Sequence, residues 1–263
     1  YPSKTIVTIH DLLPLIVPGN YPLVFKMLFK FSLRKMDRYK RIITVSESTK
    51  RDLIGATNIP EEKIDVIPEG VDPFFTPGVS QRDHLDLPKN KKIILHVGTE
   101  EKRKNVSFLI LVLNLILSKL DDVLLIRVGD QRNETKKLIR DFSLHDKIHY
   151  VGWKSRNKLR ALYRSCDLFI FPSTYEGFGL TPLEAMASGC PVISSNVSSL
   201  PEIIGGGGLL LPLDAETWAS KACELLSSNS KRRKIIEAGL KQASKFTWRK
   251  AAKKTLEAYQ KTR

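Results

Sequence analysis

Two glutamates, Glu176 and Glu184, bracket a loop that contains Gly177 and Gly179. Spacing alone proves nothing, because the same interval separates two other pairs, Glu61 with Glu69 and Glu216 with Glu224. Only the middle pair flanks glycines at the predicted end of a strand, where one carboxylate could face a sugar and the other a ribose beyond a diphosphate. Two simpler interpretations stay open: Glu176 as a solvated turn residue, and Glu184 as a helix-capping residue that needs no ligand.

The residues around this loop predict a strand that ends at Phe171 and a helix that begins at Thr181. Thr181 is a favourable N-cap, Pro182 suits the first helical position, and Glu184 would complete a capping box. Gly189 then ends the helix. Free N–H groups and the helix dipole favour a phosphate or diphosphate at such a point, so the segment predicts an anion site.

A second polar cluster runs from His96 to Asn105. Gly98 permits a tight turn, Arg103 and Lys104 can neutralise phosphate oxygens, and Asn105 can cap the next helix. Because ligands of open parallel sheets lie at the carboxyl ends of the strands, we expect this cluster to share a site with the glycine loop. A solvated basic turn is the alternative. No GxGxxG or GxxxxGK[ST] motif is present, which argues against NAD-type and P-loop sites.

Short β-branched runs alternate with helix-length segments after residue 90, which predicts a six-stranded, doubly wound parallel sheet. We expect its strands near residues 92–97, 122–128, 147–151, 167–171, 191–194 and 208–211. Three further strands are expected near residues 4–9, 41–45 and 63–67. Three strands are too few to close a domain. The predicted fold class is therefore α/β with two Rossmann-like domains, the first incomplete within this chain.

A polar stretch rich in turn formers separates the two zones. We therefore divide the chain into four parts. Residues 1–75 form the C-terminal part of the first Rossmann-like domain, and residues 76–90 form a linker. Residues 91–247 form the second Rossmann-like domain, and residues 248–263 form a basic helix that returns to the first domain.

The composition is that of a folded protein, with 42% hydrophobic and 27% charged residues, and it excludes the disordered and collagen-like classes. The longest nearly apolar run, residues 106–117, is too short to cross a bilayer. No signal-peptide pattern opens the chain. The three cysteines form no CxxC pair, which indicates small core residues in a reducing, cytoplasmic location and no metal site.

The net charge of +15 is unevenly distributed. Residues 215–263 hold 13 Lys or Arg and only 4 Asp or Glu. Another basic group recurs every four residues, on one helical face: Lys26, Lys30, Arg34 and Arg38. The same segment carries apolar residues that either pack on the first sheet, which we favour, or enter an anionic membrane: Phe25, Leu28, Phe29, Leu33 and Met36. Nucleic acid is not expected, because no aromatic residues interleave with the basic ones along a common groove.

These motifs, in this order, resemble retaining glycosyltransferases of family 4, which have two Rossmann-like domains in the GT-B arrangement. The resemblance covers nearly the whole chain, and the segment from Glu176 to Glu184 is its most specific part. The other matching segments are residues 8–12 (TIHDL), 44–49 (TVSEST), 66–72 (VIPEGVD), 97–98 (VG) and 103–105 (RKN).

The resemblance implies a donor-sugar site around the glycine loop. Glu176 would contact the hydroxyls of the donor sugar near the reacting face, and the backbone of Gly177, Phe178 and Gly179 would line that sugar. Glu184 would hold the ribose hydroxyls. Glu176 need not act as a nucleophile, because similar enzymes retain the anomeric configuration by attack on the face that the diphosphate leaves.

The resemblance also implies how the diphosphate is held. Leu180 and Thr181 would offer backbone N–H groups, and Arg103 and Lys104 would neutralise the charge beside the Gly98 turn. No Asp-x-Asp metal-binding motif occurs, so a metal-independent reaction is expected. No cofactor is expected beyond the donor substrate itself, a UDP- or GDP-linked sugar.

The remaining implied contacts come from outside these two loops. His10 would reach the donor sugar across the cleft, and Val151 with Gly152 would border the nucleobase. Two positions depart from the family pattern: Glu69 stands where many relatives have Asn, and Thr99 where many have Arg. The latter change shifts phosphate binding onto Arg103 and Lys104.

The function implied is hexosyl transfer from a nucleoside-diphosphate sugar, with retention, to a glycan, a lipid-linked sugar or a small molecule. A nucleotide-sugar epimerase of the same architecture is one alternative. A non-catalytic basic module for membranes or anions is another. A peripheral position at the inner membrane face would suit a lipid-linked acceptor.

Overall fold

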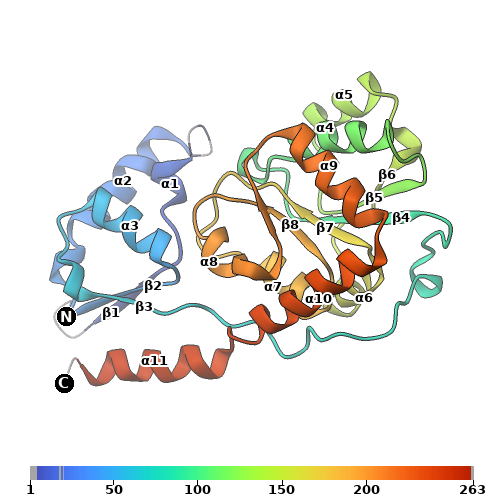
Figure 1. Cartoon of the computed structure of the whole chain (residues 1–263). Coiled ribbons are helices and arrows are strands. Elements are labelled where there is room, and N and C mark those ends of the chain that lie inside the picture. The colour runs from blue at the N-terminus through green and yellow to red at the C-terminus, as the bar shows by residue number, and fades with distance from the viewer. Residues whose placement is uncertain (1–4, 18, 20, 262–263) are drawn as a thin grey trace.

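Two parallel β-sheets organise the α/β fold of the computed structural model, which describes residues 5–17, 19 and 21–261 (Figure 1). The first sheet has the order β1 (Ile6–Ile9), β2 (Arg41–Thr44), β3 (Ile64–Val66). The second has the order β6 (Ile148–Tyr150), β5 (Val123–Val128), β4 (Lys92–Val97), β7 (Leu168–Phe171), β8 (Val192–Ser195), β9 (Leu209–Leu211). We call the two sheets with their helices the first and second lobes. The predicted α/β class and six-stranded parallel sheet are confirmed.

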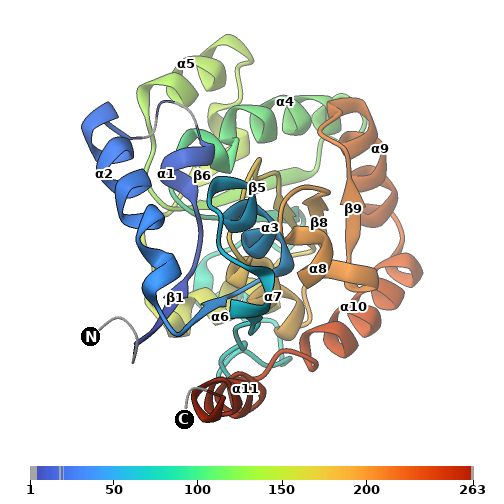
Figure 2. The ribbon, with the colours of Figure 1, turned by 90° about the vertical axis from the view of Figure 1, so that its left-hand side faces the viewer.

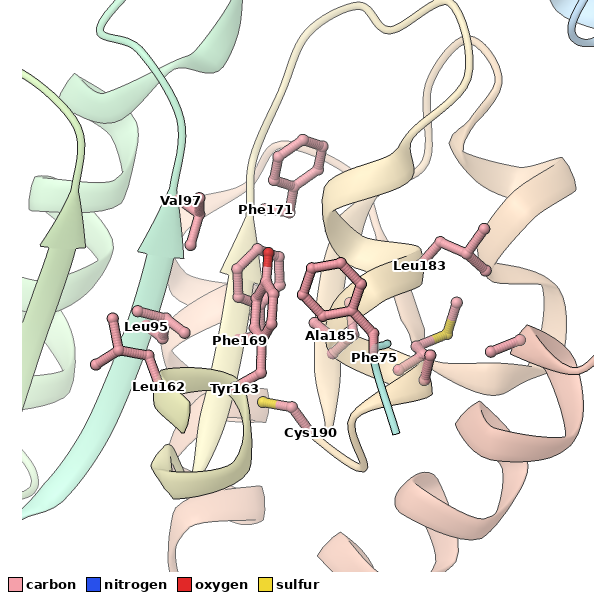
Figure 3. Packing of buried hydrophobic residues seen from close by; sticks show 14 of the residues in the cluster. Phe75, Leu95, Val97, Leu162, Tyr163, Phe169, Phe171, Leu183, Ala185 and Cys190 are labelled. Carbon is pink, nitrogen blue, oxygen red and sulfur yellow. The ribbon is translucent and has the colours of Figure 1, made fainter. Parts of the chain in front are cut away.

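The inner strands of the second sheet, β4, β5, β7 and β8, are buried on both faces: their successive side chains point to opposite sides, and helices cover each side. Ile93 and Leu95 join a cluster covered by α6 (Arg156–Ser165), α7 (Leu180–Ala187), α8 (Leu200–Ile204) and α10 (Asn229–Ala243). Ile94 joins the opposite cluster, under α4 (Val106–Leu117), α5 (Asn133–Asp141) and α9 (Ala215–Leu226). Figure 3 shows Phe169 and Phe171 of β7 between β4 and α7. The strand before the glycine loop is therefore rigidly packed.

The first sheet is covered by helices from both ends of the chain. On one face it packs against residues of α2 (Leu23–Arg34) and α3 (Glu47–Ala56), close to the short α1 (Leu13–Ile16). On the other face, Ala251 and Ala258 of α11 (Trp248–Gln260) pack against Ile43 and Ile67. Figures 1 and 2 show α11 beside the first lobe, far in sequence from its other elements. The four-part division of the chain remains a prediction.

Short 3-10 turns complete the connections. They are Met36–Arg38, Glu61–Lys63, Asp83–Leu85, Lys102–Lys104, His145–Lys147 and Gly205–Gly207. The nine expected strands all form within two residues of their predicted bounds, although residue 4 lies outside the described residues. Cys190 is buried in the second lobe, with its sulfur 2.8 Å from that of the half-buried Cys166.

Helix α2 only partly follows the expectation that its apolar residues pack on the first sheet. Leu33 is buried and Phe29 packs beside it, but Leu28 is 63% exposed and Phe25 is 46% exposed. A single helix can turn one stripe toward a sheet, so residues on the opposite side must face away. That opposite side, which we call the α2 face, consists of Leu23, Val24, Met27, Leu28 and Phe31, all exposed.

The packing of α11 predicts a position-specific sensitivity. Ala258 is 1% exposed against the first sheet, whereas Ala252 on the same helix is exposed. We expect Ala258→Glu to lower the thermal midpoint by at least about 5 °C, because it forces a charge and extra volume against Ile43 and Ile67. The Ala252→Glu control should leave the midpoint unchanged in the same calorimetric scan. Equal shifts for both variants would show that α11 is not docked on the sheet.

Candidate functional site

The candidate site lies where the order of the second sheet reverses. Strands β4 and β7 are neighbours, and the chain leaves them toward opposite sides, which opens a crevice at their carboxyl ends. The loops after both strands meet there, since the N–H of Thr174 donates to the carbonyl of Arg103 at 2.7 Å. The expected convergence of the two motifs is therefore present in the structure.

A buried ion cluster joins these two loops. One oxygen of Glu176 accepts from Nζ of Lys104 at 2.7 Å, and the other accepts from Nη1 of Arg103 at 2.9 Å. Arg103 also donates through Nε to Glu101 at 2.9 Å. Glu176 is only 8% exposed, so the solvated-turn interpretation of this residue is wrong. The solvated basic turn is equally wrong for Lys104, which is 8% exposed.

Burial and charge oppose each other in this cluster. Burial is the main influence on Lys104 and lowers the pKa of its ammonium, while Glu176 partly offsets that effect. For Arg103, burial would lower the pKa, but the nearby carboxylates of Glu176 and Glu101 raise it. The ammonium of Lys104 also lies 4.8 Å from the centre of the Phe171 ring, a cation–π contact that supports its charge.

The N-cap of helix α7 lies two residues earlier than the sequence predicts. Gly179 is its N-cap, with φ of 120°, so Thr181 and Pro182 are its second and third residues. The predicted capping box is therefore wrong, because a glycine in this conformation turns the chain into the helix without a side-chain cap. The first bond across this turn runs from the N–H of Leu183 to the carbonyl of Gly179. The N–H groups of Leu180 and Thr181 precede that ladder, and both residues are half-buried at the crevice.

Glu184 lies deeper on α7 and does not cap it. Its Oε2 accepts from the hydroxyl of Tyr163 at 3.2 Å. Burial raises the pKa of Glu184 to about 7, with only partial compensation from the Tyr163 hydroxyl. A half-buried carboxylate with one protein partner retains free acceptor positions, which suits binding of ligand hydroxyls.

The first lobe contacts the glycine loop directly. A Cβ on Gly177 would lie 2.2 Å from the carbonyl oxygen of His10, so only glycine fits there. The ring of His10 is exposed and lies 3.1 Å from Glu69. His10 therefore contacts the loop through its backbone carbonyl, while its exposed ring pairs with Glu69 at the edge of the contact.

The other predicted site residues surround this centre. Gly98 has a φ of 148°, which favours glycine, and it lies beside the Lys104 stem. Val151 is half-buried and Gly152 is exposed, at the end of β6. Asn105 is the N-cap of α4 but adopts a left-handed conformation without a side-chain cap bond, so its predicted capping role is wrong.

A hollow of about 370 Å³ lies next to these loops. It is lined by residues of both lobes: Gly19, Tyr21, Glu101, Lys102 and Arg132. Its basic side chains and its position beside the ion cluster give the crevice room for an anionic ligand.

Sequence reasoning missed two groups of polar residues at the site. Hydroxyls of Ser198 and Ser199 hold the backbone of residues 176–178. Behind β4, the fully buried Arg127 donates to Nδ1 of His96 at 2.6 Å, and its guanidinium lies 3.7 Å from Glu100. A serine pair in the short loop after a buried strand, three residues beyond the end of β8, was a usable signal for the first group. In the second group, His96 and Glu100 belong to the predicted polar cluster, but Arg127 had no local signal, because it lies on β5, 31 residues away from His96 in the sequence.

Family models match both halves of the chain. Glycosyl transferases group 1 matches residues 80–242, and Glycosyltransferase Family 4 matches residues 1–74. The chain belongs to the glycosyl transferases group 1 family. An uncharacterized glycosyltransferase of Methanocaldococcus jannaschii is 31% identical to this group 1 chain over 231 residues, which are 83% of the chain and 59% of that protein.

Bacterial relatives of this group 1 chain include mannosyltransferases. The O-antigen chain mannosyltransferase B of Escherichia coli is 29% identical over 268 residues, which are 98% of this chain and 70% of that protein. This chain therefore spans only part of the length of its curated relatives.

Solved structures of the same architecture are GT-B glycosyltransferases. Sucrose-phosphate synthase from Thermosynechococcus elongatus superposes with a TM-score of 0.83 at 25% identity, over 98% of this chain and 67% of that one. The Anabaena protein HepE, solved with UDP-glucose, gives a TM-score of 0.82 at 21% identity, over 97% and 72% of the two chains. The second likeness concerns the fold alone.

The raised pKa of Glu184 predicts a pH-dependent effect of removing its charge. A folded-state pKa of about 7, above the ordinary 4.5, means that an ionisation penalty develops as pH rises from about 4.5 and is complete above about 7. Glu184→Gln removes this penalty, so its stability relative to the parent should rise by about 2 kcal/mol between pH 5 and pH 8. Denaturant unfolding at both pH values measures the change.

The control for this prediction is Glu216→Gln, which removes a carboxylate from an exposed helix position. Its stability relative to the parent should be the same at pH 5 and pH 8. A Glu184→Gln variant that behaves like this control would show that Glu184 is not held in a charge-disfavouring environment.

Proposed function

We propose that this chain carries the donor site of a glycosyltransferase that moves a hexosyl group from a nucleoside-diphosphate sugar to an acceptor, with retention of anomeric configuration. Membership of the group 1 family and the mannosyltransferase relatives support this type of reaction. The observation that carries the proposal is the position of two cations, the buried Lys104 and the half-buried Arg103, and of the start of α7 at one crevice. The donor is UDP- or GDP-linked, and the UDP-glucose bound to the Anabaena relative supports a uridine donor.

The proposed diphosphate site lies at the start of α7. Phosphate oxygens accept from the N–H groups of Leu180 and Thr181, which the helix leaves unpaired. Lys104 and Arg103 lie next to this turn through their contacts with Glu176, and they share their donors with the phosphate when it enters. When the anomeric C–O bond breaks, its electron pair stays on the phosphate, and these fixed charges stabilise it without a metal ion.

The proposed role of Glu176 is to hold the donor sugar. Each of its carboxylate oxygens already faces a cation, which makes the group a poor nucleophile but leaves lone pairs for sugar hydroxyls. The backbone of Gly177, Phe178 and Gly179 lines the same sugar. His10 contributes from the first lobe, where its exposed ring can turn toward the cleft. The acceptor hydroxyl then attacks on the face that the diphosphate leaves, and its proton passes to the departing phosphate oxygen.

The nucleoside extends from the diphosphate along the second lobe. The Glu184 carboxylate accepts hydrogen bonds from the ribose hydroxyls, while Val151 and Gly152 border the base. Binding in this manner favours the ionised form of Glu184, so donor binding releases a proton near pH 7.

The two alternatives differ from the proposal in what they do with the donor. A nucleotide-sugar epimerase would convert the donor in the absence of any acceptor, whereas a transferase would leave its sugar configuration unchanged. A non-catalytic basic module would show no sugar transfer at all. No feature of the site favours either alternative over a transferase.

We also propose that the acceptor is carried by an anionic membrane and that the enzyme sits peripherally on its inner, cytoplasmic face. The α2 face exposes five large apolar side chains on one side of a helix whose opposite side packs on the first sheet. Lys30, Arg34 and Lys35 are exposed beside this face. This combination is typical of helices that lie in the headgroup region. None of the helices in the described part of the chain is long and apolar enough to span a bilayer.

Loss of the Lys104 charge tests the donor site. We expect Lys104→Met to weaken binding of the UDP or GDP sugar that the parent binds by at least tenfold, because a buried charge-assisted contact to phosphate is lost. The matched control is Lys137→Met, which removes an exposed lysine of α5. Calorimetric titration of the folded variants measures both. Unchanged affinity in Lys104→Met would contradict the assigned crevice.

Membrane docking is tested at the α2 face. We expect Leu28→Glu to reduce cosedimentation with vesicles rich in anionic lipid by at least severalfold, because a charge then replaces an inserting apolar group. Leu256→Glu, at a 57% exposed leucine of α11, is the control and should sediment like the parent. Binding of the parent that is insensitive to anionic lipid content, or equal loss in both variants, would contradict docking through α2.

A further inference from the structure

The backbone of the glycine loop is held by side-chain hydroxyls of the second lobe. The N–H of Glu176 donates to Oγ of Ser198 at 2.9 Å. The hydroxyl of Ser199 lies 2.9 Å from the carbonyl of Glu176 and 2.6 Å from that of Phe178. Because these contacts are to backbone atoms, they fix the course of the loop independently of its side chains.

The first lobe holds the same loop at the position between them. The carbonyl of Gly177 accepts from the hydroxyl of Ser46 at 2.7 Å and from that of Thr49 at 3.1 Å. Ser46 is the N-cap of α3, and Thr49 lies in its first turn. The hydrogen bonds from the first lobe to the loop therefore depend on the position of the N-terminus of α3.

A carboxylate from the second lobe binds that N-terminus. The two oxygens of Glu202, on α8, accept from the N–H groups of Glu47 at 2.8 Å and Ser48 at 2.7 Å. Arg51 of α3 adds a longer ion pair at 3.7 Å. Two charge-assisted bonds to a helix N-terminus are favourable both as hydrogen bonds and through the helix dipole.

We propose that Glu202 is a positioning residue for the glycine loop. The segment from Ser198 to Glu202 acts on the glycine loop in two ways. Its two serines bind the loop backbone directly. Glu202 binds the N-terminus of α3 and so holds the hydroxyls of that helix start against the Gly177 carbonyl. The loop is thereby set at the depth where Glu176 meets Arg103 and Lys104. The link to donor binding rests on the proposed function, whereas the effect of Glu202 on the loop does not.

Hydrogen exchange of the free protein tests the positioning role without any donor. We expect Glu202→Ala to speed amide exchange at least tenfold both in the first turn of α3 and at residues 176–179, since the two lobes then share fewer bonds around the loop. Glu202→Gln keeps one acceptor oxygen and should give an intermediate increase. The control is Glu61→Ala, which removes a carboxylate that pairs with Lys50 of α3 within the first lobe. It should leave the amide exchange rates of residues 176–179 unchanged.

Steady-state kinetics of the same variants supply the second measurement. If the loop is loosened, the KM for the donor should be severalfold higher in Glu202→Ala than in the parent, and intermediate in Glu202→Gln. The change in kcat should be smaller. Faster exchange confined to residues 47–49 would overturn the proposal, because Glu202 would then be only a cap for α3. A loosened loop with an unchanged donor KM would also overturn it. If the parent transfers no sugar, the proposed function fails, and the exchange result still decides what Glu202 does to the loop.

Discussion

The buried carboxylate of Glu176 can exist at this depth only because two cations meet it. An isolated charge in a low-dielectric interior is costly, and an ion pair of this kind adds little net stability over a well-packed apolar core. The ion pairs of Glu176 therefore require that the loops after β4 and β7 lie within hydrogen-bond distance of each other. The buried Phe169 and Phe171, held between β4 and α7, provide the rigid base for that arrangement (Figure 3).

The same constraint explains why both lobes are needed around one loop. A glycine at position 177 lets the backbone after β1 approach so closely that no side chain fits between them. Hydroxyls of Ser46 and Ser199, the N-caps of α3 and α8, then satisfy the loop carbonyls that this close approach would otherwise leave buried and unpaired. The glycine loop therefore belongs to the second lobe, but its backbone is held by hydrogen bonds from both lobes.

Hydrophobic periodicity was enough to predict the strands, because each is a short apolar run between turn formers. It also placed the Arg103–Lys104 and Glu176 segments at one sheet edge, since all strands are parallel. It could not predict that these residues pair with each other, because that depends on loop paths over residues 98–105 and 172–179. The helix start at Thr181 was misassigned because a capping-box pattern competes with a positive φ at Gly179, which only the folded backbone reveals. Glu202 was missed because its partners are 154 and 155 residues away.

The central claim is that the start of α7 and the two cations form one diphosphate site. A crystal structure of the protein with a bound nucleoside diphosphate tests it most directly. The account predicts phosphate oxygens at about 3 Å from the backbone nitrogens of Leu180 and Thr181 and from Nζ of Lys104. A diphosphate bound elsewhere, with the Glu176 ion cluster unchanged and no ligand at the start of α7, would contradict it.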